Sequence, residues 1–501
     1  MKRIITYILF AGVLSGLSSC KKFLDQASQD LIRPVTVEHY KELLQGEGYF
    51  KDMYRNGWFV DVMTDDIMLL DLAYPTTVVN AKTEASKFAY QWGHDLEDPT
   101  GTFTDKLFQT MYKNILAANT CLEALDKATG TEAEKKVLRG QALFTRAYGY
   151  FVLANLYSKI YSTENLDELC VPLTTETSPS LKRYNRAKIK EVWDIISSDI
   201  ETAVADLSGD QGTRTVYEIN YKAALLFASR VFLYMQQYDK AIEYGERFLL
   251  LHPKLFDITG YTNSPSPTGT HANKAFLLVN HNPEIVFTFS RFSSASGEGG
   301  YVYFTREPVG LSPHTYSASF NSYSPLINSY GANDRRKNYW FSQPTGAPGL
   351  ILSYPAYTPM KLNYYEGART SQYMRSAEVY LNLAEAYAKK PSPNNGRAID
   401  LLNQLRSNRI ASYTDLTAGD FADQQALITF ILEERRRELC FEEFHRWWDL
   451  RRNGQPYLEH VWLTDTYKLN QNDAGYVLNF PRYELEFNPD LVPNVRPVRN
   501  P

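Results

Sequence analysis

Acidic residues that could support catalysis occur as the adjacent pair Asp65 and Asp66 in the stretch TDD. A glycosidase needs two carboxylates about 5 to 10 Å apart, one of them tuned as an acid. Adjacent residues of an extended chain point in different directions, so we expect these two to cap a turn or a helix instead. The sequence also has no HExxH, CxxC or GxSxG motif, and the GEGG stretch at 297–300 lacks a P-loop lysine. We therefore expect no enzyme, no bound metal and no cofactor.

One further acidic cluster could hold a cation. Asp95, Glu97 and Asp98 lie together in DLEDPTG. Calcium is bound by such oxygen ligands, but this stretch lacks the alternating acids and the central glycine of an EF-hand loop. The cluster therefore gives no specific indication of calcium.

Aromatic and polar side chains suited to sugar binding are concentrated in two stretches. The chain has 36 tyrosines, and 14% of its residues are aromatic. Aromatic faces stack against the apolar C–H surface of a sugar, and charged or amide side chains bond to its hydroxyl groups. The alternative for each ring is ordinary packing, and a peptide ligand or a scaffold that binds only protein remains open. The ligand-binding candidates are Tyr74, Trp92, Asp95, Arg291, Tyr301, Tyr303 and Tyr316.

The N-terminal residues have the pattern of a secretion signal. Lys2 and Arg3 precede an apolar run from Ile4 to Leu17, which is too short to span a membrane. The LSSC stretch that ends at Cys20 resembles the bacterial lipobox, in which the cysteine is acylated; the alternative is an ordinary signal peptide. We expect residues 1–19 to be removed and Cys20 to carry a lipid anchor, since several acyl chains give stable membrane attachment.

Charge and cysteine content argue against a nucleic-acid-binding protein and against a disulfide framework. The net charge is −4 with acids and bases interspersed, so nucleic acid is not an expected partner. Cys121, Cys170 and Cys440 are widely spaced and can form at most one disulfide. We expect buried free thiols.

The elements that must position these residues are mostly helical. Small and large apolar residues alternate at helical spacing over 141–157, 223–250 and 376–409, which is typical of tetratricopeptide-like helix pairs of about 34 residues. Helices over 103–125 and 190–206 would extend the array, and a generic helical bundle is the alternative. The sequence thus predicts one domain over 20–501 with a mostly α scaffold and a large irregular face of loops and short strands. The loops cover about 56–102 and 257–370, with strands at 283–290 and 301–304.

A charged run near the C-terminus carries a family resemblance. Residues 431–452, ILEERRRELCFEEFHRWWDLRR, would as a helix pair Glu433 with Arg437 and Glu442 with Arg446. The run resembles the C-terminal signature of the SusD/RagB family, the outer-membrane nutrient-binding lipoproteins of Bacteroidetes, and departs from it at Glu443, where the family usually has glycine. Further resemblances along the chain are CKKFLD, TDD, RGQALFTRAYGYFVLANLY, YKAALLFASRVFLY, PEIVFTFS, DRR, MRSAEVYLNLAEAYAK and FPRYELEFNPDL.

The resemblance implies a non-catalytic protein at the cell surface. It would be lipid-anchored in the outer membrane and would bind an oligosaccharide or polysaccharide, or in peptide-binding relatives a peptide. It would deliver that ligand to a SusC-like TonB-dependent transporter. The ligand site would lie in the two loop regions, away from the helix pairs, and the signature helix would be structural, with its charges satisfied by one another.

Overall fold

The computed structural model describes most of the chain. The described residues are 34–67, 87–97, 104–177, 182–209, 215–263, 276, 277, 279–291, 319, 320, 325–342, 356–359, 361, 370–462 and 465–499. Cys20 and the expected strand at 301–304 lie outside these ranges.

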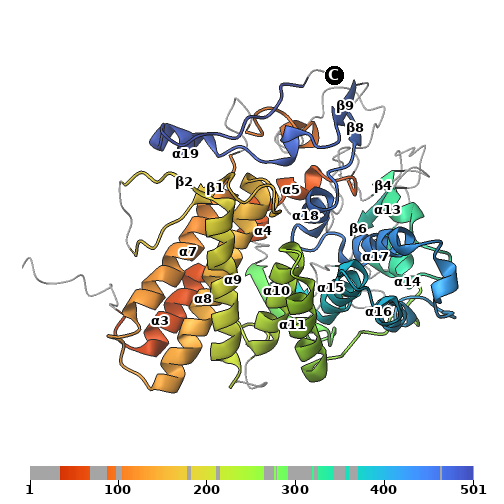
Figure 1. Cartoon of the computed structure of the whole chain (residues 1–501), viewed down its shortest axis with the longest axis horizontal. Coiled ribbons are helices and arrows are strands. Elements are labelled where there is room, and N and C mark those ends of the chain that lie inside the picture. The colour runs from red at the N-terminus through yellow and green to blue at the C-terminus, as the bar shows by residue number, and fades with distance from the viewer. Residues whose placement is uncertain are drawn as a thin grey trace, which may run out of the picture.

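Long helices form an array in which each helix packs against the next along the chain (Figure 1). The three helical segments expected from the sequence are confirmed, as are the two additional helices and the mostly α fold. The last helix of the array, α16, packs on α15, which also contacts α10. The array consists of α7 (Leu107–Ala124), α8 (Glu132–Tyr157), α9 (Ile189–Leu207), α10 (Tyr221–Tyr234), α11 (Tyr238–Leu251), α15 (Ser376–Lys389) and α16 (Asn395–Ser407).

Small residues allow these helices to approach closely. A Cβ added at Gly149 of α8 would lie 2.9 Å from Ile115 of α7, and one added at Gly245 of α11 would lie 2.7 Å from Leu383 of α15. Both distances are too short for a methyl group, so the two glycines are needed for the packing.

The start of α8 is encoded by nearby residues, since Thr131 and Glu134 form a reciprocal capping box there.

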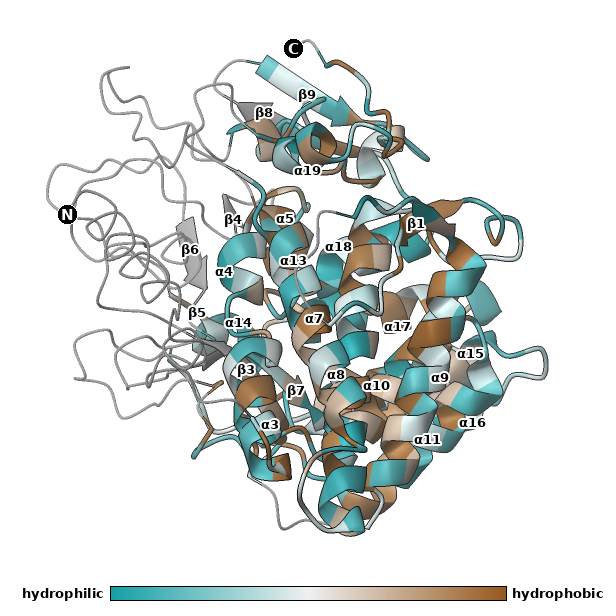
Figure 2. Ribbon diagram, turned by 90° about the vertical axis from the view of Figure 1, so that its left-hand side faces the viewer, coloured by the Kyte–Doolittle hydropathy of each residue, from teal (hydrophilic) through white to brown (hydrophobic). Residues whose placement is uncertain are grey.

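Four short helical elements precede the array. The first two of them, α3 and the π-helix η1, pack on α7 and α8. Figure 2 shows hydrophobic and hydrophilic residues on the same helices, as amphipathic packing requires. The elements are α3 (Val37–Leu43), η1 (Leu44–Gly48), α4 (Met53–Gly57) and α5 (Phe59–Val62).

The strands are short and form small separate sheets. The expected strand at 283–290 is confirmed as β3, which pairs antiparallel with β7, and β7 continues directly into α15. A second, smaller hydrophobic core lies here, around Trp340 and Tyr339, beside the main core of the helices. The strands are β1 (Leu169–Pro172), β2 (Arg186–Lys188), β3 (Ile285–Arg291), β4 (Ser319–Phe320), β5 (Phe341–Ser342), β6 (Ala356–Pro359), β7 (Thr370–Arg375), β8 (Leu458–Trp462) and β9 (Asp465–Leu469).

The C-terminal signature forms two helices, so the expected single helix over 431–452 is wrong. The chain turns at Phe441 and Glu443, whose φ angles of 61° and 47° are left-handed and end the first helix. The remaining helical elements are α13 (Pro325–Asn328), α14 (Arg335–Trp340), η5 (Ala418–Asp420), α17 (Gln424–Leu439), α18 (His445–Arg452), η6 (Ala474–Tyr476) and α19 (Arg482–Phe487).

The three described cysteines match the expectation of buried free thiols. Cys121, Cys170 and Cys440 are free and buried, and burial raises the pKa of the Cys170 and Cys440 thiols to about 11. Within the described ranges, no helix has both the length and the apolar character needed to cross a membrane.

Candidate ligand-binding region

Trp92 is the first predicted ligand residue whose side chain the structure describes. It is fully buried, its Nε1–H donates to the Met63 carbonyl at 2.9 Å, and its ring stacks on His460 with centroids 4.1 Å apart. Tyr90 stacks on the same histidine, also at 4.1 Å. Trp92 therefore packs in the protein interior, and neither face of its ring is accessible to a ligand.

Asp95 is the second described candidate, and it already has protein partners. Its carboxylate accepts from Nε of Arg482 at 2.6 Å and from the Glu97 backbone N–H at 3.0 Å. Glu97 in turn accepts from the backbone N–H groups of Asp105 and Arg482. Asp95 keeps a side-chain exposure of 41%, so it can still reach solvent. These acids are engaged by hydrogen-bond donors, which gives no support for calcium among them.

The structure does not describe the side chains of the other candidates. Arg291 is the last residue of β3 and pairs with Thr370, but its side chain lies outside the described residues. Tyr74, Tyr301, Tyr303 and Tyr316 also lie outside them. Their role in ligand binding remains a prediction.

The chain before the first candidate stretch is tied to the C-terminal signature. Asp65 forms a two-pronged ion pair with Arg446, with both N···O distances 2.8 Å, and Asp66 accepts from Arg436 at 2.7 Å. Burial opposes the ionisation of Asp65, but Arg436 and Arg446 still lower its pKa. The expectation that Asp65 and Asp66 cap a turn or helix is therefore replaced by a role as anchors.

The second candidate stretch is tied to the same signature through β3. Glu284, just before β3, is fully buried and accepts from Arg375 at 2.7 Å and from Arg409 at 2.5 Å. Both arginines also bond to Glu438 of α17, and Arg375 bonds to Glu442 as well. The expected pairing of Glu442 with Arg446 is therefore wrong, because each residue bonds to a distant partner instead.

This buried set of ion pairs is the feature that sequence reasoning missed. Its members come from stretches already singled out as separate resemblances, namely TDD, PEIVFTFS, DRR and MRSAEVYLNLAEAYAK. Asp334 and Arg336 of DRR, for example, bond to each other, and Arg336 reaches Glu434 and Glu438. The sequence does carry one sign of these pairs, since charged residues stand inside segments that are otherwise apolar. Such charged residues cannot be buried without partners.

A second buried group surrounds Glu443, the residue at which the sequence departs from the resemblance described above. Its carboxylate accepts from Arg230 at 2.7 Å and from the Tyr148 hydroxyl at 2.5 Å. The same guanidinium donates to Glu378 at 2.6 and 2.7 Å. Burial raises the pKa of Glu443 and lowers that of the neighbouring His445.

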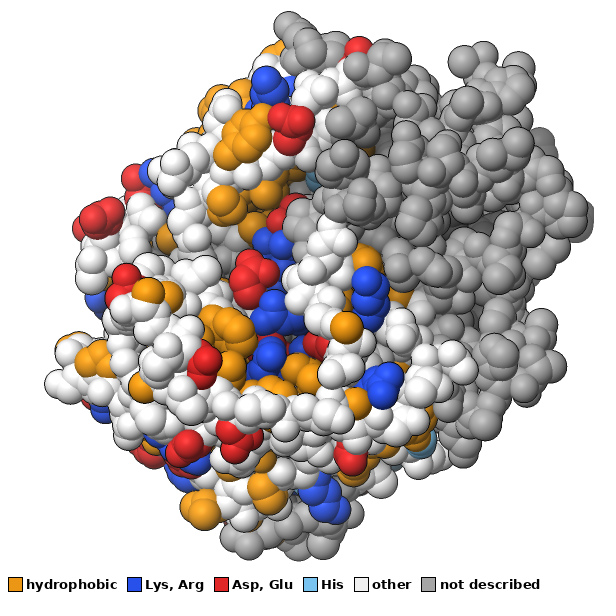
Figure 3. All heavy atoms as spheres, turned by 90° about the vertical axis from the view of Figure 1, so that its right-hand side faces the viewer, with side chains coloured by type: hydrophobic (Ala, Val, Ile, Leu, Met, Phe, Trp, Pro, Cys, Tyr) orange, Lys and Arg blue, Asp and Glu red, His pale blue; other side chains and the backbone are white. Residues whose placement is uncertain are grey.

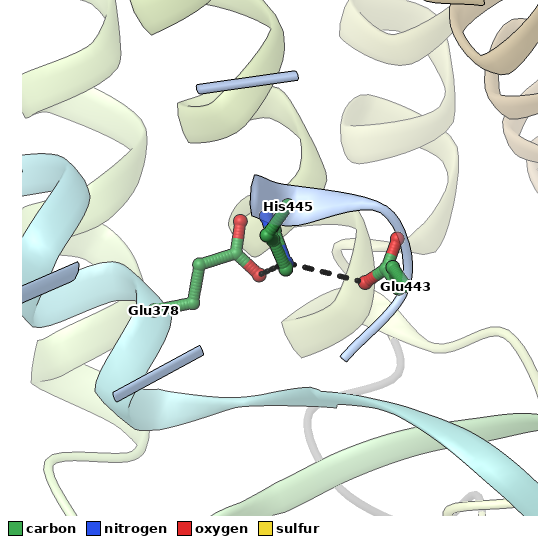
Figure 4. Close-up of side chains that lie close together, drawn as sticks. All are labelled: Glu378, Glu443 and His445. Atoms are coloured by element: carbon green, nitrogen blue, oxygen red, sulfur yellow. Dashed lines mark ion pairs between the residues drawn. The ribbon is translucent and has the colours of Figure 1, made fainter. Parts of the chain in front are cut away.

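Glu378, Glu443 and His445 are the described residues that come nearest to a metal site (Figure 4). Their potential ligand atoms lie within 4.8 Å of one another, and His445 Nε2 is 3.8 Å from Glu378 and 3.7 Å from Glu443. A cation here would have to displace Arg230, which already bonds to both carboxylates. The group is therefore an internal ion cluster and does not fit a metal.

The face on the side of α14, α16 and α17 is hollowed near its middle (Figure 3). Basic, acidic and hydrophobic side chains gather in this hollow.

Comparison with known proteins identifies the class of protein. The family described as "Starch-binding associating with outer membrane" matches residues 22–233, and the "SusD family" matches residues 258–491. The chain is 25% identical to the SusD-like protein P2 of Formosa agariphila, over 76% of this chain and 78% of that protein. It is 24% identical to the SusD-like protein P38 of the same organism, over 72% and 78%.

Solved structures have the same fold. A SusD superfamily protein from Bacteroides thetaiotaomicron matches with a TM-score of 0.71 and 22% identity, over 92% of this chain and 100% of that one. A SusD-like carbohydrate binding protein from Bacteroides vulgatus matches with a TM-score of 0.67 and 20% identity, over 93% and 99%. The chain belongs to the SusD/RagB family, which consists of non-catalytic binding proteins associated with the outer membrane.

Proposed function

We propose that this protein is a lipid-anchored receptor at the cell surface that captures a glycan and delivers it to a SusC-like TonB-dependent transporter in the outer membrane. The observation that carries the proposal is the pair of family matches, which together span nearly the whole chain and include a family described as starch-binding. The carbohydrate binding stated for the similar Bacteroides vulgatus protein supports the same ligand class.

The anchoring of both candidate stretches supports a binding role for them. Residues 68–86 follow Asp65 and Asp66, which are fixed to Arg436 and Arg446. The second stretch follows β3, which ends at Arg291 and whose start is fixed by Glu284. Rigid attachment of loop ends lowers the entropy lost when a ligand is bound. We therefore propose Tyr74, Asp95, Arg291, Tyr301, Tyr303 and Tyr316 as the ligand-contacting residues.

The first experiment tests ligand class directly. The protein lacking residues 1–20 is run in affinity gels that contain a panel of polysaccharides, and mixed peptides are titrated in parallel by calorimetry. We expect one glycan to retard the protein without being cleaved. Tyr301→Ala and Tyr303→Ala should each weaken retention about fivefold or more, because a stacked aromatic ring contributes about 1 kcal/mol beyond its buried area.

A matched control separates ligand contact from general damage. Leu250 is an exposed apolar residue on α11, outside both candidate stretches, and Leu250→Ala should leave retention unchanged. Trp92→Ala should instead lower the free energy of unfolding by about 3 kcal/mol or more, because it removes a buried ring. Peptide binding without glycan retention would replace the glycan proposal, and cleavage of any polysaccharide would contradict the absence of catalysis.

Delivery to a transporter requires a separate test. Outer membranes solubilised in mild detergent should yield this protein together with a TonB-dependent barrel protein when an affinity-tagged version of the chain is purified. Recovery of the chain alone under conditions that preserve other outer-membrane complexes would contradict the transporter partnership while leaving the glycan binding untouched.

A further inference from the structure

An exposed apolar strip follows the C-terminal segment of the chain. Among the described residues, ten large hydrophobic side chains are exposed to solvent, and five of these belong to the strip. Single exposed apolar side chains are normal on a protein surface, whereas their concentration in one place indicates a surface that another molecule covers. The strip consists of Leu169 in β1, Phe487 at the end of α19, and Val492, Val495 and Val498.

The three valines recur at every third residue. They are 55%, 79% and 75% exposed, and the chain around them has neither helix nor strand. A three-residue repeat is that of an extended polyproline-type chain, and Pro493 and Pro497 favour this conformation. With this repeat the valines share one face, about 9 Å apart from one to the next.

The other side of the same segment is fixed to the protein. Asn494 donates from its side-chain amide to the Tyr157 carbonyl at 2.6 Å. Arg496 is only 2% exposed and donates to the Val477 carbonyl at 3.1 Å. The valines are therefore held outward by a rigid support, which lowers the entropy that a partner must remove on binding.

The strip extends sideways onto β1. The guanidinium of Arg186 donates to the carbonyls of both Leu169 and Val492, at 2.7 and 3.1 Å, so these two residues lie next to each other. In Figure 1, α19, β1 and the C-terminus lie at the same end of the molecule. The strip thus belongs to one end of the fold.

This end also carries part of the candidate ligand-binding region. Arg499 donates to the Trp92 carbonyl at 3.0 Å, and Arg496 donates to the Gly93 carbonyl at 3.1 Å. The partly exposed ligand candidate Asp95 follows Gly93 by two residues. A molecule that covers the strip would therefore lie beside a bound ligand.

The chemistry of the strip selects a protein as its occupant. Valine has no flat ring on which a sugar can stack and no group that bonds to hydroxyl groups. Its side chain is stabilised by removal from water into apolar surroundings. Apolar pockets on another protein provide such surroundings.

The expected lipid tether is long enough to bring the strip to a protein in the same membrane. From Cys20 to Pro34, the first described residue, the chain advances 14 positions, which span at most about 50 Å. The described chain enters the fold at Thr129, just before α8, whereas the strip is attached at Tyr157, the last residue of α8. The 26 residues of α8 are about 39 Å long, so the tether can span the distance between the two ends.

We propose that this strip is the surface by which the protein docks on the transporter that receives its ligand. The inference rests on the proposed function and adds the surface and its chemistry. The transporter would present three apolar pockets about 9 Å apart, one for each valine. Docking here would place the ligand candidates next to the receiving protein.

The test compares variants of the strip in the full-length, anchored chain. An affinity-tagged version is purified from outer membranes solubilised in mild detergent, and the recovered barrel protein is quantified by mass spectrometry. The double variant Val495→Asp with Val498→Asp should recover at least tenfold less barrel protein than the unchanged chain, because it places two charges in an apolar interface. Leu250→Asp is the matched control, since Leu250 is 85% exposed on α11, and it should keep the barrel protein.

Two further measurements separate docking from damage to the fold. The double variant should keep the thermal midpoint of the unchanged protein, because both valines are exposed, and it should still be retarded by the same polysaccharide. Val495→Ser with Val498→Ser introduces no charge and should also reduce the recovery of barrel protein. A lower thermal midpoint in both double variants would assign the valines to the fold and overturn the docking role.

The remaining outcomes distinguish the strip from the proposed function. Full recovery of barrel protein by both double variants would overturn the strip and leave the transporter partnership intact. No barrel protein with the unchanged chain would contradict the partnership itself, and with it the occupant of the strip. If the double variants keep the barrel protein but abolish a dimer in gel filtration, or binding to vesicles of phosphatidylethanolamine and lipopolysaccharide, the strip serves a second copy or the membrane instead.

Discussion

At the scale of single residues, His460 couples pH to the stability of the region around Trp92. Its ring lies between Tyr90 and Trp92, and its two nitrogens contact the carbonyl oxygens of Tyr90 and Thr64 at 2.7 and 3.0 Å. Burial lowers the pKa of His460 to about 4, although the two carbonyl contacts act in the opposite direction. The neutral ring is therefore the form that the fold stabilises at pH 7.

The depressed pKa predicts a loss of stability in acid. Below about pH 6.5 the unfolded chain takes up a proton on His460 that the folded protein does not accept, so stability falls as the pH drops from about 6.5 to about 4. The loss amounts to about 3 kcal/mol over this window. His460→Gln should remove it, as measured by urea unfolding at pH 7 and pH 4.5.

The comparison with a second variant isolates this histidine from the many other titrating groups. His39→Gln, on α3, should keep the pH dependence of the unchanged protein. The interpretation fails if His460→Gln and the unchanged protein lose the same stability between the two pH values.

At the scale of secondary-structure elements, Arg375 joins four parts of the chain. It lies at the end of β7, where α15 begins, and its guanidinium bonds to Glu284, Glu438 and Glu442 at 2.7 Å each. Because every partner is buried, removing the cation leaves uncompensated carboxylates in the interior. Arg375 thereby fixes both the start of β3 and the turn between α17 and α18.

We expect Arg375→Met to lower the free energy of unfolding by about 3 to 5 kcal/mol, the usual cost of breaking a buried ion pair from one side. Arg375→Lys should lose less, since it keeps the charge but not the forked geometry. Guanidinium unfolding followed by circular dichroism measures both. Lys190→Met breaks an exposed pair with Asp194 and should have no measurable effect. An effect of Arg375→Met no larger than that of Lys190→Met would show that the buried pairs do not hold these elements.

The sequence predicted the elements of the scaffold well because their patterns are local. The break between α10 and α11 and the turn between α15 and α16 can both be read from helical periodicity and from breaking residues. The interruption of the signature was not predictable in this way. Glu443 has a good intrinsic preference for helix, and it is held at a left-handed φ by buried bonds to distant segments, from its carboxylate to Arg230 and Tyr148 and from its backbone N–H to Gln372.

The same limit applies to the candidate ligand-binding region. Aromatic composition identified stretches rich in suitable side chains, but it could not separate a ring that packs from a ring that binds. Trp92 and His460 are 368 residues apart in the sequence and form one stack in the fold. Likewise, the charged signature was expected to satisfy itself, and Asp449 does bond to both Arg435 and Arg452 within it. The remaining partners, Asp65, Glu284 and Arg375, come from distant segments that the pattern of the signature does not reveal.

At the scale of the whole molecule, the chain combines a rigid helical array with segments attached to it at fixed points. The ion pairs of the signature connect residues from near both ends of the described chain, as in the pairs of Asp65 and Asp66 with Arg446 and Arg436. A scaffold of this kind can present a binding surface at a distance from a membrane anchor without large internal motion. Its usefulness as a receptor then depends on attachment to the cell.

The expected acylation of Cys20 supplies that attachment and can be tested separately from binding. We predict that Cys20→Ser moves the protein from the membrane fraction to the soluble fraction, because the thiol that accepts the diacylglycerol is removed and the remaining chain offers no described membrane-spanning helix. The variant should still be retarded by the same polysaccharide as the anchored protein, since the candidate ligand residues are unchanged.

Cell fractionation, detergent-phase partition and protease treatment of intact cells measure this outcome. Cys121→Ser is the matched control, because Cys121 is a buried thiol whose replacement should leave the protein in the membrane fraction. If the Cys20→Ser protein stays in the detergent phase and on the cell surface, a lipid on Cys20 is not what holds it there. Determining its N-terminal residue then separates retention of the apolar run at 4–17 from attachment through the transporter. Loss of anchoring with binding retained would instead separate the two functions, capture by the folded domain and retention by the lipid.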